Sequence, residues 1–155
     1  MMPTTEHESA LRDVISPGYT ALCLAVPPAV IEAVATRAGP GGLVIACGIA
    51  PVPVPAQVAF LRCSPQALPI LSHSIDGAVT DAAVAEDDAA LSELRRVLAP
   101  GRALALLLAP ADSAPASDLR ALLATLGFVI ADAGAANAIV ATVPPWMGTT
   151  RRQRA

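Results

Sequence analysis

The chain has 155 residues, which is the size of one domain. Hydrophobic residues make up 54% of it and charged residues 15%, a balance that excludes an intrinsically disordered protein. The formal net charge is −3 and every basic residue is an arginine. No broad basic face is therefore expected, and nucleic acid is not an expected partner.

Cysteine content and the first residues of the chain bear on its location. Three cysteines, an odd number without the spacing of a zinc site, are typical of a reducing compartment. Residues 1–9 are polar and acidic, which does not fit a signal peptide. The longest apolar run, 103–109, is far shorter than the ~20 residues of a membrane span. We therefore expect a soluble, cytoplasmic protein with no transmembrane segment.

The first third of the chain predicts a helix, a strand, a second helix and a second strand. Apolar residues at helical spacing predict a helix over 6–15, and the continuous apolar run 19–26 predicts a strand buried on both faces. The prolines at 27–28 fit the first turn of a helix, which Gly39 ends. A second buried strand is expected over 43–47.

The middle of the chain departs from strict alternation of strands and helices. Alternate prolines after the second strand exclude a helix there and indicate a rigid, extended connection. Strands are expected over 58–62 and 75–80, with a loop between them. The strongest helix pattern covers 86–98. The arginines at 95–96 lie in its last turns, where positive charge interacts favourably with the helix dipole. The Pro-Gly pair at 100–101 is expected to stop this helix.

The last third predicts one more strand and helix, followed by a hairpin. A strand is expected over 102–108 and a helix over 115–126. Two further strands, 128–133 and 138–143, are joined by a short loop of Gly, Ala and Asn, which is typical of an antiparallel hairpin.

Strands that alternate with helices predict a single α/β domain. We expect a mostly parallel sheet of about seven strands with right-handed crossovers, to which the C-terminal hairpin adds an antiparallel strand. The predicted organisation is an N-terminal helical extension over 1–18, the α/β domain over 19–143 and an extended tail over 144–155.

A resemblance to a known family rests on motifs in the second half of the chain. These motifs are Leu68-Pro69, Ser74-Ile75-Asp76-Gly77-Ala78-Val79, Leu91-Ser92-Glu93-Leu94-Arg95-Arg96-Val97-Leu98-Ala99-Pro100-Gly101-Arg102 and Gly127-Phe128. They resemble the class I (Rossmann-like) S-adenosylmethionine-dependent methyltransferases of the small-molecule type. That family shows a Leu-Pro turn, an aromatic-Asp-x-Val fourth strand and a helix ending in Leu-x-Glu-x-x-Arg-Val-Leu-x-Pro-Gly-Gly. The resemblance implies a Rossmann-like methyltransferase fold.

The resemblance also implies three cofactor contacts, and the sequence departs from each of them. The family's glycine-rich turn after strand one corresponds to 25–29, which has no glycine and contains two prolines without N–H donors. The acid that holds the ribose corresponds to Cys47 and Gly48, and the acid that reads the adenine amine corresponds to Ser64. The chain is therefore predicted to be a degenerate member that takes no cofactor.

On these grounds no catalytic, cofactor-binding or metal-binding residue is assigned. We predict a non-catalytic methyltransferase-like domain that acts as a structural or accessory subunit of a larger protein complex. The alternative is a divergent but active S-adenosylmethionine-dependent small-molecule methyltransferase, because methyl transfer depends on positioning an activated donor more than on many side chains. A third interpretation is a small-molecule-binding or regulatory domain.

Cysteine and histidine are the residue types most able to form a reactive site. Cys23, Cys47 and Cys63 fall in or near the ends of the first three strands. A metal or redox site is one interpretation, and buried structural cysteines are the favoured one. His7 is expected in a mobile terminus. His73 precedes the fourth strand and is a candidate general base only if a partner positions it.

Several polar residues lie beside predicted elements. Asp76 is expected to have a structural role where the fourth strand begins, and Asp87 and Asp88 to lie at the start of a helix. Thr80 and Asp81 end the fourth strand, where methyltransferases often place substrate-facing groups. For Asp81 a solvated loop acid is the favoured interpretation.

The tail holds the only tryptophan, Trp146, ahead of Arg151, Arg152 and Arg154. Trp and Arg are enriched at interface hot spots, so a docking tail for a protein partner or multi-subunit complex is one interpretation. A tail that folds back on its own domain is the other. Three arginines attract an anionic membrane surface weakly, so peripheral membrane contact stays open.

Overall fold

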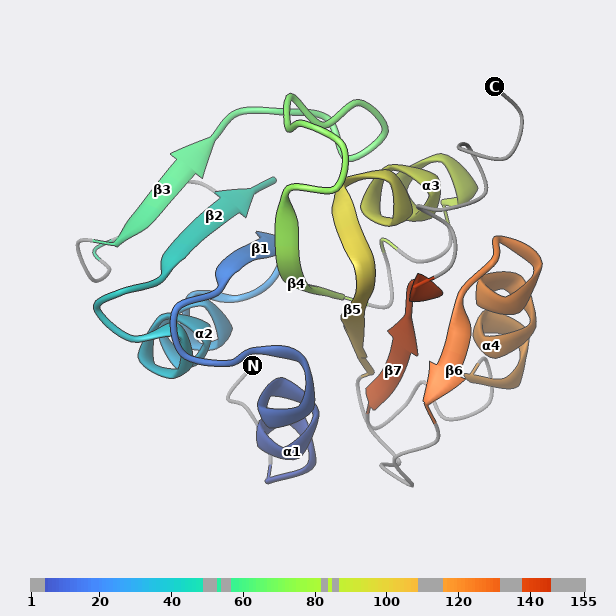
Figure 1. The fold of residues 1–155 in the computed structure, drawn as a ribbon, viewed down its shortest axis with the longest axis horizontal. Helices are drawn as coiled ribbons and strands as arrows, with labels where there is room; N and C mark the ends of the chain where they lie inside the picture. The colour runs from blue at the N-terminus through green and yellow to red at the C-terminus, as the bar shows by residue number, and fades with distance from the viewer. Residues whose placement is uncertain are drawn as a thin grey trace.

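The computed structural model describes residues 5–48, 53, 57–81, 84, 87–108, 116–131 and 138–145. Its elements, in chain order, are α1 (Thr5–Val14), β1 (Thr20–Leu24), α2 (Pro28–Ala38), β2 (Leu43–Cys47), β3 (Val58–Leu61), β4 (Ile75–Asp81), α3 (Asp88–Val97), β5 (Leu98–Leu107), α4 (Ala116–Thr125), β6 (Val129–Ala131) and β7 (Ala138–Thr142) (Figure 1). In these ranges no helix is long and apolar enough to span a membrane.

The strands form one seven-stranded sheet in the order β3-β2-β1-β4-β5-β7-β6. Neighbours among β1 to β5 pair in parallel, whereas β7 pairs antiparallel with both β5 and β6. This arrangement confirms the predicted α/β fold with a C-terminal antiparallel hairpin.

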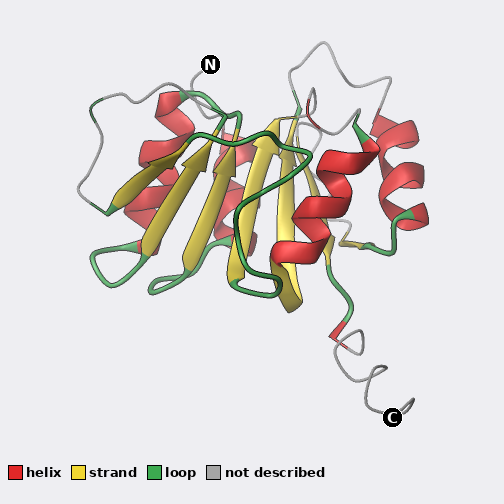
Figure 2. Ribbon diagram, turned by 90° about the horizontal axis from the view of Figure 1, so that it is seen from above, coloured by secondary structure: helices red, strands yellow, loops and turns green. Residues whose placement is uncertain are grey.

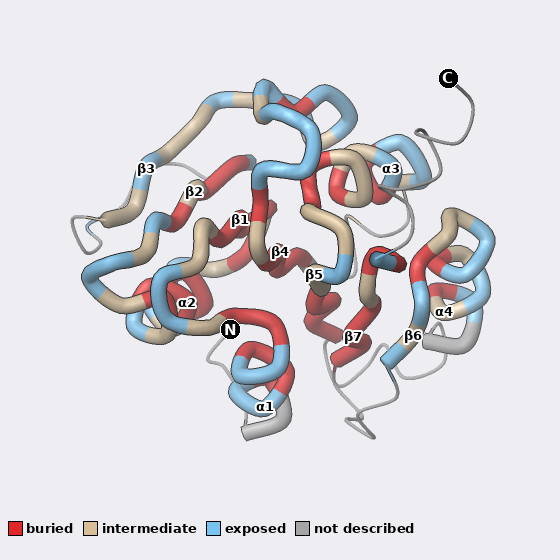
Figure 3. The backbone as a smooth tube through the Cα atoms, viewed as in Figure 1, coloured by how far each residue is buried: buried red, intermediate tan, exposed pale blue. Residues whose placement is uncertain are grey.

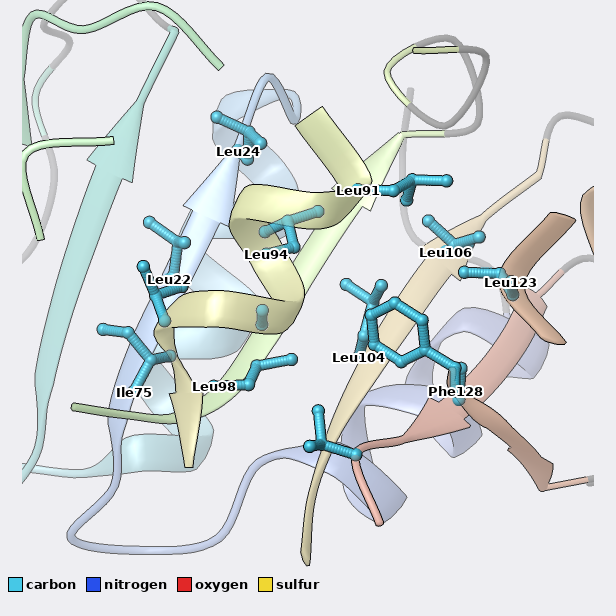
Figure 4. Close-up of a cluster of buried hydrophobic side chains, with 14 of the residues drawn as sticks. Leu22, Leu24, Ile75, Leu91, Leu94, Leu98, Leu104, Leu106, Leu123 and Phe128 are labelled. Carbon is cyan, nitrogen blue, oxygen red and sulfur yellow. The ribbon is translucent and has the colours of Figure 1, made fainter. Parts of the chain in front are cut away.

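Helices cover both faces of the sheet (Figure 2). Buried side chains of α1 and α2 pack on one face, and those of α3 and α4 pack on the other. Figure 4 shows the second cluster, in which leucines of α3 and α4 meet leucines of β1 and β5 and the ring of Phe128. This core consists mainly of aliphatic side chains, which bury apolar area and have no polar group that would need a hydrogen-bond partner.

Helix α1 lies against the sheet along its buried side (Figure 3). Its residues Leu11 and Val14, and Ile15 after it, are at most 2% exposed. The close approach depends on Gly77 of β4, because a Cβ added there would lie 2.5 Å from the carbonyl oxygen of Val14 and 2.8 Å from Cδ1 of Ile15. The absence of a side chain at Gly77 therefore determines how closely the helix packs.

The boundary between α3 and β5 differs from the prediction. The helix ends at Val97 and the strand begins at Leu98, so Pro100 and Gly101 lie within β5 and do not stop the helix. Leu98 already has extended φ and ψ angles of −70° and 133°, and it pairs with Ile75 of β4. Pairing with β4 draws the chain into the sheet before the local stop signal is reached.

Arg96 holds the connection between β3 and β4, a role that the dipole argument did not predict. Its guanidinium donates to the carbonyl oxygens of Leu68 (2.9 Å) and Ile70 (2.8 Å) and to Oγ of Ser72 (3.1 Å). It also pairs with Glu93 at 2.6 Å, and Glu93 accepts a hydrogen bond from the backbone N–H of Leu68 (2.8 Å). Two side chains of α3 thus fix a segment that has no helix of its own.

Asp76 has the structural role expected of it. Its carboxylate accepts a hydrogen bond from the N–H of Thr20 (3.0 Å) and lies 3.7 Å from the guanidinium of Arg102. Arg102 also lies 4.8 Å from the centre of the Tyr19 ring. These contacts tie together the starts of β1 and β4 and the first half of β5.

Candidate functional site

The strand order reverses between β1 and β4: β2 and β3 follow on one side of β1, whereas β4 and β5 lie on its other side. In open α/β sheets, ligands bind beyond the carboxyl ends of the strands at such a switch point. Here those ends are Leu24 of β1, Cys47 of β2, Leu61 of β3 and Asp81 of β4. We call this row the carboxyl edge, and it is the candidate site.

The turn after β1 has a glycine-like conformation without containing glycine. Ala25 has a φ of +54°, in the left-handed region that normally favours glycine. Its N–H donates to the carbonyl oxygen of Cys47 (2.9 Å), which ties the turn to the end of β2. Helix α2 follows, with Pro27 as its N-cap and Pro28 in its first turn, as predicted. The turn thus has positive φ even though the residue types disfavour it.

We expect Ala25→Gly to raise the free energy of unfolding by about 0.5–1 kcal/mol. A left-handed alanine destabilises the folded state by roughly 1–2 kcal/mol, and glycine removes this strain. The greater backbone freedom of glycine in the unfolded chain offsets only part of that gain. Urea denaturation measures the change. The matched control is Ala29→Gly in α2, which should lower stability by up to about 1 kcal/mol. A loss of stability at both positions would contradict the strained turn.

The three cysteines do not converge on one point. Cys23 packs toward α1 and α2, whereas Cys47 packs on the other face of the sheet. Burial raises the pKa of the Cys23 thiol to about 12, and burial together with a hydrogen bond to Cys63 raises the pKa of Cys47 to about 12. Among the described residues, no group of three or more His, Cys, Asp or Glu side chains could hold a metal ion.

A chain of polar side chains links the loop after β3 to the start of α3. Oγ of Ser64 donates to Oε1 of Gln66 (2.5 Å), and the amide of Gln66 donates to the carboxylate of Asp87. Asp87 is the N-cap of α3 and accepts from the backbone N–H groups of Ala89 (2.9 Å) and Ala90 (3.3 Å). The Gln66 hydrogen bond, followed by these backbone bonds, lowers the pKa of Asp87, so the carboxylate stays ionised.

Gln66 therefore links the ionised carboxylate of Asp87 to Ser64, the position that the resemblance aligns with the family's adenine-reading acid. The sequence predicted Asp87 only as a helix-start residue, and that part of the prediction is confirmed. Its second role was missed, since the contact with Gln66 joins residues 21 positions apart in the chain. A capping pattern gives no information about such a contact.

At the end of β4, the two candidate residues have different environments. Thr80 is fully buried and donates its hydroxyl to the carbonyl oxygen of Leu24 (2.9 Å), so it joins β4 to β1 and cannot face a substrate. Asp81 is half-buried at the carboxyl edge, beside Leu107 of β5. Of these two residues, Asp81 remains the candidate for a substrate-facing group.

The two histidines differ in how they meet the prediction, since His73 lies in the loop before β4 as expected and His7 does not lie in a mobile terminus. His7 is fully buried, and its Nε2 lies 3.2 Å from the carbonyl oxygen of Leu108, just after β5, so the expected mobile terminus is wrong at this residue. His73 is exposed with a φ of +61°, and its N–H donates to the carbonyl oxygen of Arg96 (3.0 Å). It lies near the start of β4, at the opposite edge from the candidate site.

Some predicted features lie outside the described residues. They are most of the proline-rich connection after β2, the hairpin loop 132–137, and the tail residues Trp146, Arg151, Arg152 and Arg154.

Comparison with known proteins identifies the fold. No protein-family model matches the sequence, and no curated protein matches it. A SAM-dependent methyltransferase from Aquifex aeolicus is similar in structure, with a TM-score of 0.70, 14% identity and coverage of 90% of this chain and 88% of that one. A complex of the Haloferax volcanii Trm112 methyltransferase activator with a methyltransferase is similar with a TM-score of 0.69 and 14% identity, and the match covers 88% of this chain and 88% of that one. The [4+2]-cyclase SpnF is similar with a TM-score of 0.68 and 16% identity, and the match covers 88% of this chain and 79% of that one.

These matches, together with the strand order, define the class of fold. The chain has the Rossmann-like fold of the class I S-adenosylmethionine-dependent methyltransferases, and the predicted resemblance is confirmed at the level of the fold.

The prediction that the chain takes no cofactor is contradicted by the same comparison, because structures of this fold include a SAM-dependent methyltransferase. The prediction relied on missing motif side chains at the turn after β1, at Cys47 and at Ser64. It gave too little weight to the backbone, because the positive-φ turn at Ala25 and the converging strand ends are both present.

Proposed function

We propose that this chain binds S-adenosylmethionine at the carboxyl edge and is a divergent small-molecule methyltransferase. The observation that carries the proposal is the turn after β1, where Ala25 takes a positive φ and hydrogen-bonds to the end of β2. A strained conformation is retained only where the surrounding structure requires it, and such positions cluster at ligand sites. The likeness to a SAM-dependent methyltransferase supports the choice of ligand.

The side chains at the carboxyl edge fit this cofactor in part. Asp87 and Ser64 offer a carboxylate and a hydroxyl that can accept from the adenine amine, and Asp81 offers a carboxylate at the end of β4. The backbone around Ala25 would lie along the amino-acid end of the cofactor. Cys47 stands where an acid would hold the ribose, so we expect micromolar rather than tighter affinity. When bound, S-adenosylmethionine supplies an activated methyl group, and the chain's task is to position it.

Titration calorimetry with S-adenosylmethionine and S-adenosylhomocysteine tests the proposal. We expect micromolar dissociation constants for the unmodified protein, which correspond to a binding free energy of about −8 kcal/mol. Ser64→Arg should weaken binding by more than about tenfold, because a long cationic side chain would occupy the adenine position next to Asp87.

Ser92→Arg, at an exposed position of α3, is the matched control and should bind as the unmodified protein does. No binding by a folded protein, or equal weakening by both variants, would contradict the proposed site.

A second candidate is a non-catalytic accessory subunit of a larger protein complex, located in the cytoplasm. Two observations favour it: Cys47 replaces the expected ribose acid, and a protein of this fold is found in a complex with the activator Trm112. The [4+2]-cyclase SpnF has a similar fold, so the fold alone does not make this chain a methyltransferase. Under this candidate the tail with Trp146 and its arginines is the docking segment. Cofactor binding without methyl transfer to any acceptor would favour it over the first candidate.

A further inference from the structure

A groove lies between α1 and α2, on the face of the sheet that these two helices cover. Figure 1 shows the helices beside each other, and their buried side chains belong to one cluster. The groove has a volume of about 340 Å³, which is within the range of small-molecule sites. The side chains that line it come from the middle and the last turn of each helix: Glu8, Leu11 and Arg12 of α1, and Ala33, Thr36 and Arg37 of α2.

This groove is a different place from the carboxyl edge. Helix α1 begins beside the end of β5, where His7 contacts Leu108, and it ends over Gly77, near the start of β4. Helix α2 begins after the turn at Ala25 and leads into the start of β2. Both helices therefore run away from the carboxyl edge, and the groove lies along their later turns.

Arg37 is held in place by the chain that follows α1. Its Nε and Nη2 donate to the carbonyl oxygen of Ile15 at 3.4 and 3.3 Å, and the residue is half-buried. Its Nη1 makes no hydrogen bond with another described residue, so the N–H groups on that nitrogen can bind a ligand. A guanidinium that is already fixed loses little conformational freedom when it binds.

Glu8 and Arg12 bring further charge to the groove. They lie four residues apart on α1, a spacing at which opposite charges often pair on a helix, and both are exposed. The ion pairs between described residues nevertheless involve other side chains. The helix dipole accounts for an arginine in the last turn of each helix. It does not account for two arginines and a carboxylate around one groove.

We propose that this groove binds an α-amino acid with an apolar side chain. The guanidiniums of Arg12 and Arg37 match the carboxylate of such a ligand, because their planar donors suit carboxylate oxygens. The carboxylate of Glu8 matches its ammonium group, and Leu11 and Ala33 supply apolar contact for its side chain. A simple anion is a poorer match, because Glu8 repels it.

The inference does not depend on cofactor binding, because none of the groove residues lies at the carboxyl edge. Its failure and the failure of the proposed function are therefore separate results.

Titration of the full chain with leucine, followed by the NMR shifts of its backbone amides, tests the inference. We expect a dissociation constant on the order of 1 mM, with shift changes in α1 and α2 and none at the carboxyl edge. Two further probes resemble leucine but lack one charged group: 4-methylpentanoate has no ammonium, and 3-methylbutylamine has no carboxylate. Each should bind about tenfold more weakly than leucine.

Charge-removing variants test the assigned roles. Glu8→Gln should weaken leucine binding about fivefold and should strengthen the binding of 4-methylpentanoate, because the variant removes a repulsion. Arg12→Gln and Arg37→Gln should weaken the binding of both ligands. Asp13→Asn is the matched control, because it removes a carboxylate from an exposed position of α1 outside the groove, and it should bind leucine as the unmodified protein does.

Equal affinity for leucine and 4-methylpentanoate would overturn the inference, and so would equal responses to Glu8→Gln and Asp13→Asn. Shift changes confined to the carboxyl edge, or none at leucine concentrations well above the expected dissociation constant, would also overturn it. Arg12 is exposed, so Arg12→Gln should still fold, and circular dichroism verifies the fold of each variant.

Discussion

Gly77→Ala should lower the free energy of unfolding by about 3 kcal/mol, at the upper end of the usual cost of overpacking. The added Cβ would lie 2.5 Å from the carbonyl oxygen of Val14 and 2.8 Å from Cδ1 of Ile15. The nearest atom is backbone, so relief requires α1 to move away from the sheet. Such a movement would expose the apolar contacts that α1 makes with β4, β5 and β7. Urea denaturation followed by circular dichroism measures the loss.

Gly41→Ala is the matched control for Gly77→Ala. A Cβ at Gly41 would meet nothing within 4 Å, and its φ is not in the left-handed region. We expect no loss of stability there, and a gain of up to about 1 kcal/mol from the stiffer unfolded chain. Equal effects at the two glycines would show that α1 does not pack on the sheet as described.

Arg96→Ala should lower the free energy of unfolding by about 2 kcal/mol, because it removes charge-assisted hydrogen bonds to the carbonyl oxygens of Leu68 and Ile70. About one third of the Arg96 side chain is exposed (34%), so water replaces part of each lost bond and the effects of the separate bonds do not add. Without this anchor the segment between β3 and β4 should exchange its amide hydrogens faster. Thermal melting and hydrogen exchange measure the two effects.

Two arginine variants separate geometry from charge. Arg96→Lys keeps the positive charge beside Glu93 but cannot reach both carbonyl oxygens with one planar group, so it should recover less than half of the lost stability. Arg120→Ala, on α4, should change stability by no more than about 0.5 kcal/mol. Full recovery by lysine would mean that the ion pair with Glu93, rather than the loop carbonyls, carries the effect.

Much of the fold could be predicted because several buried strands, such as β1, β2 and β7, are built around a short apolar run. The range 43–47 was predicted to the residue, since glycines on both sides bound it. The end of α3 was predicted too late, because the local Pro-Gly signal at 100–101 was used, whereas sheet pairing at Leu98 already ends the helix at Val97. Boundaries follow local signals only where tertiary pairing agrees with them.

The candidate site was predicted less well, because its contacts join distant parts of the chain. The burial of His7 depends on Leu108, 101 residues away, and no local pattern encodes that contact. The opposite facing of Cys23 and Cys47 depends on strand register, which places Leu24 rather than Cys23 beside Cys47. The left-handed turn was missed because an alanine at Ala25 gives no sign of a positive φ.

The antiparallel direction of β7 determines where the described chain leaves the sheet. Thr142 pairs with Ala103 and Ala138 with Leu107, so β7 runs away from the carboxyl edge, and Val143 then bonds to Gly101 and Arg102. The exit point and the candidate site are thus at opposite poles of the domain. A surface, resin or fusion partner attached directly after residue 145 would leave the carboxyl edge facing away from the attachment point, so the candidate site would stay accessible for binding measurements.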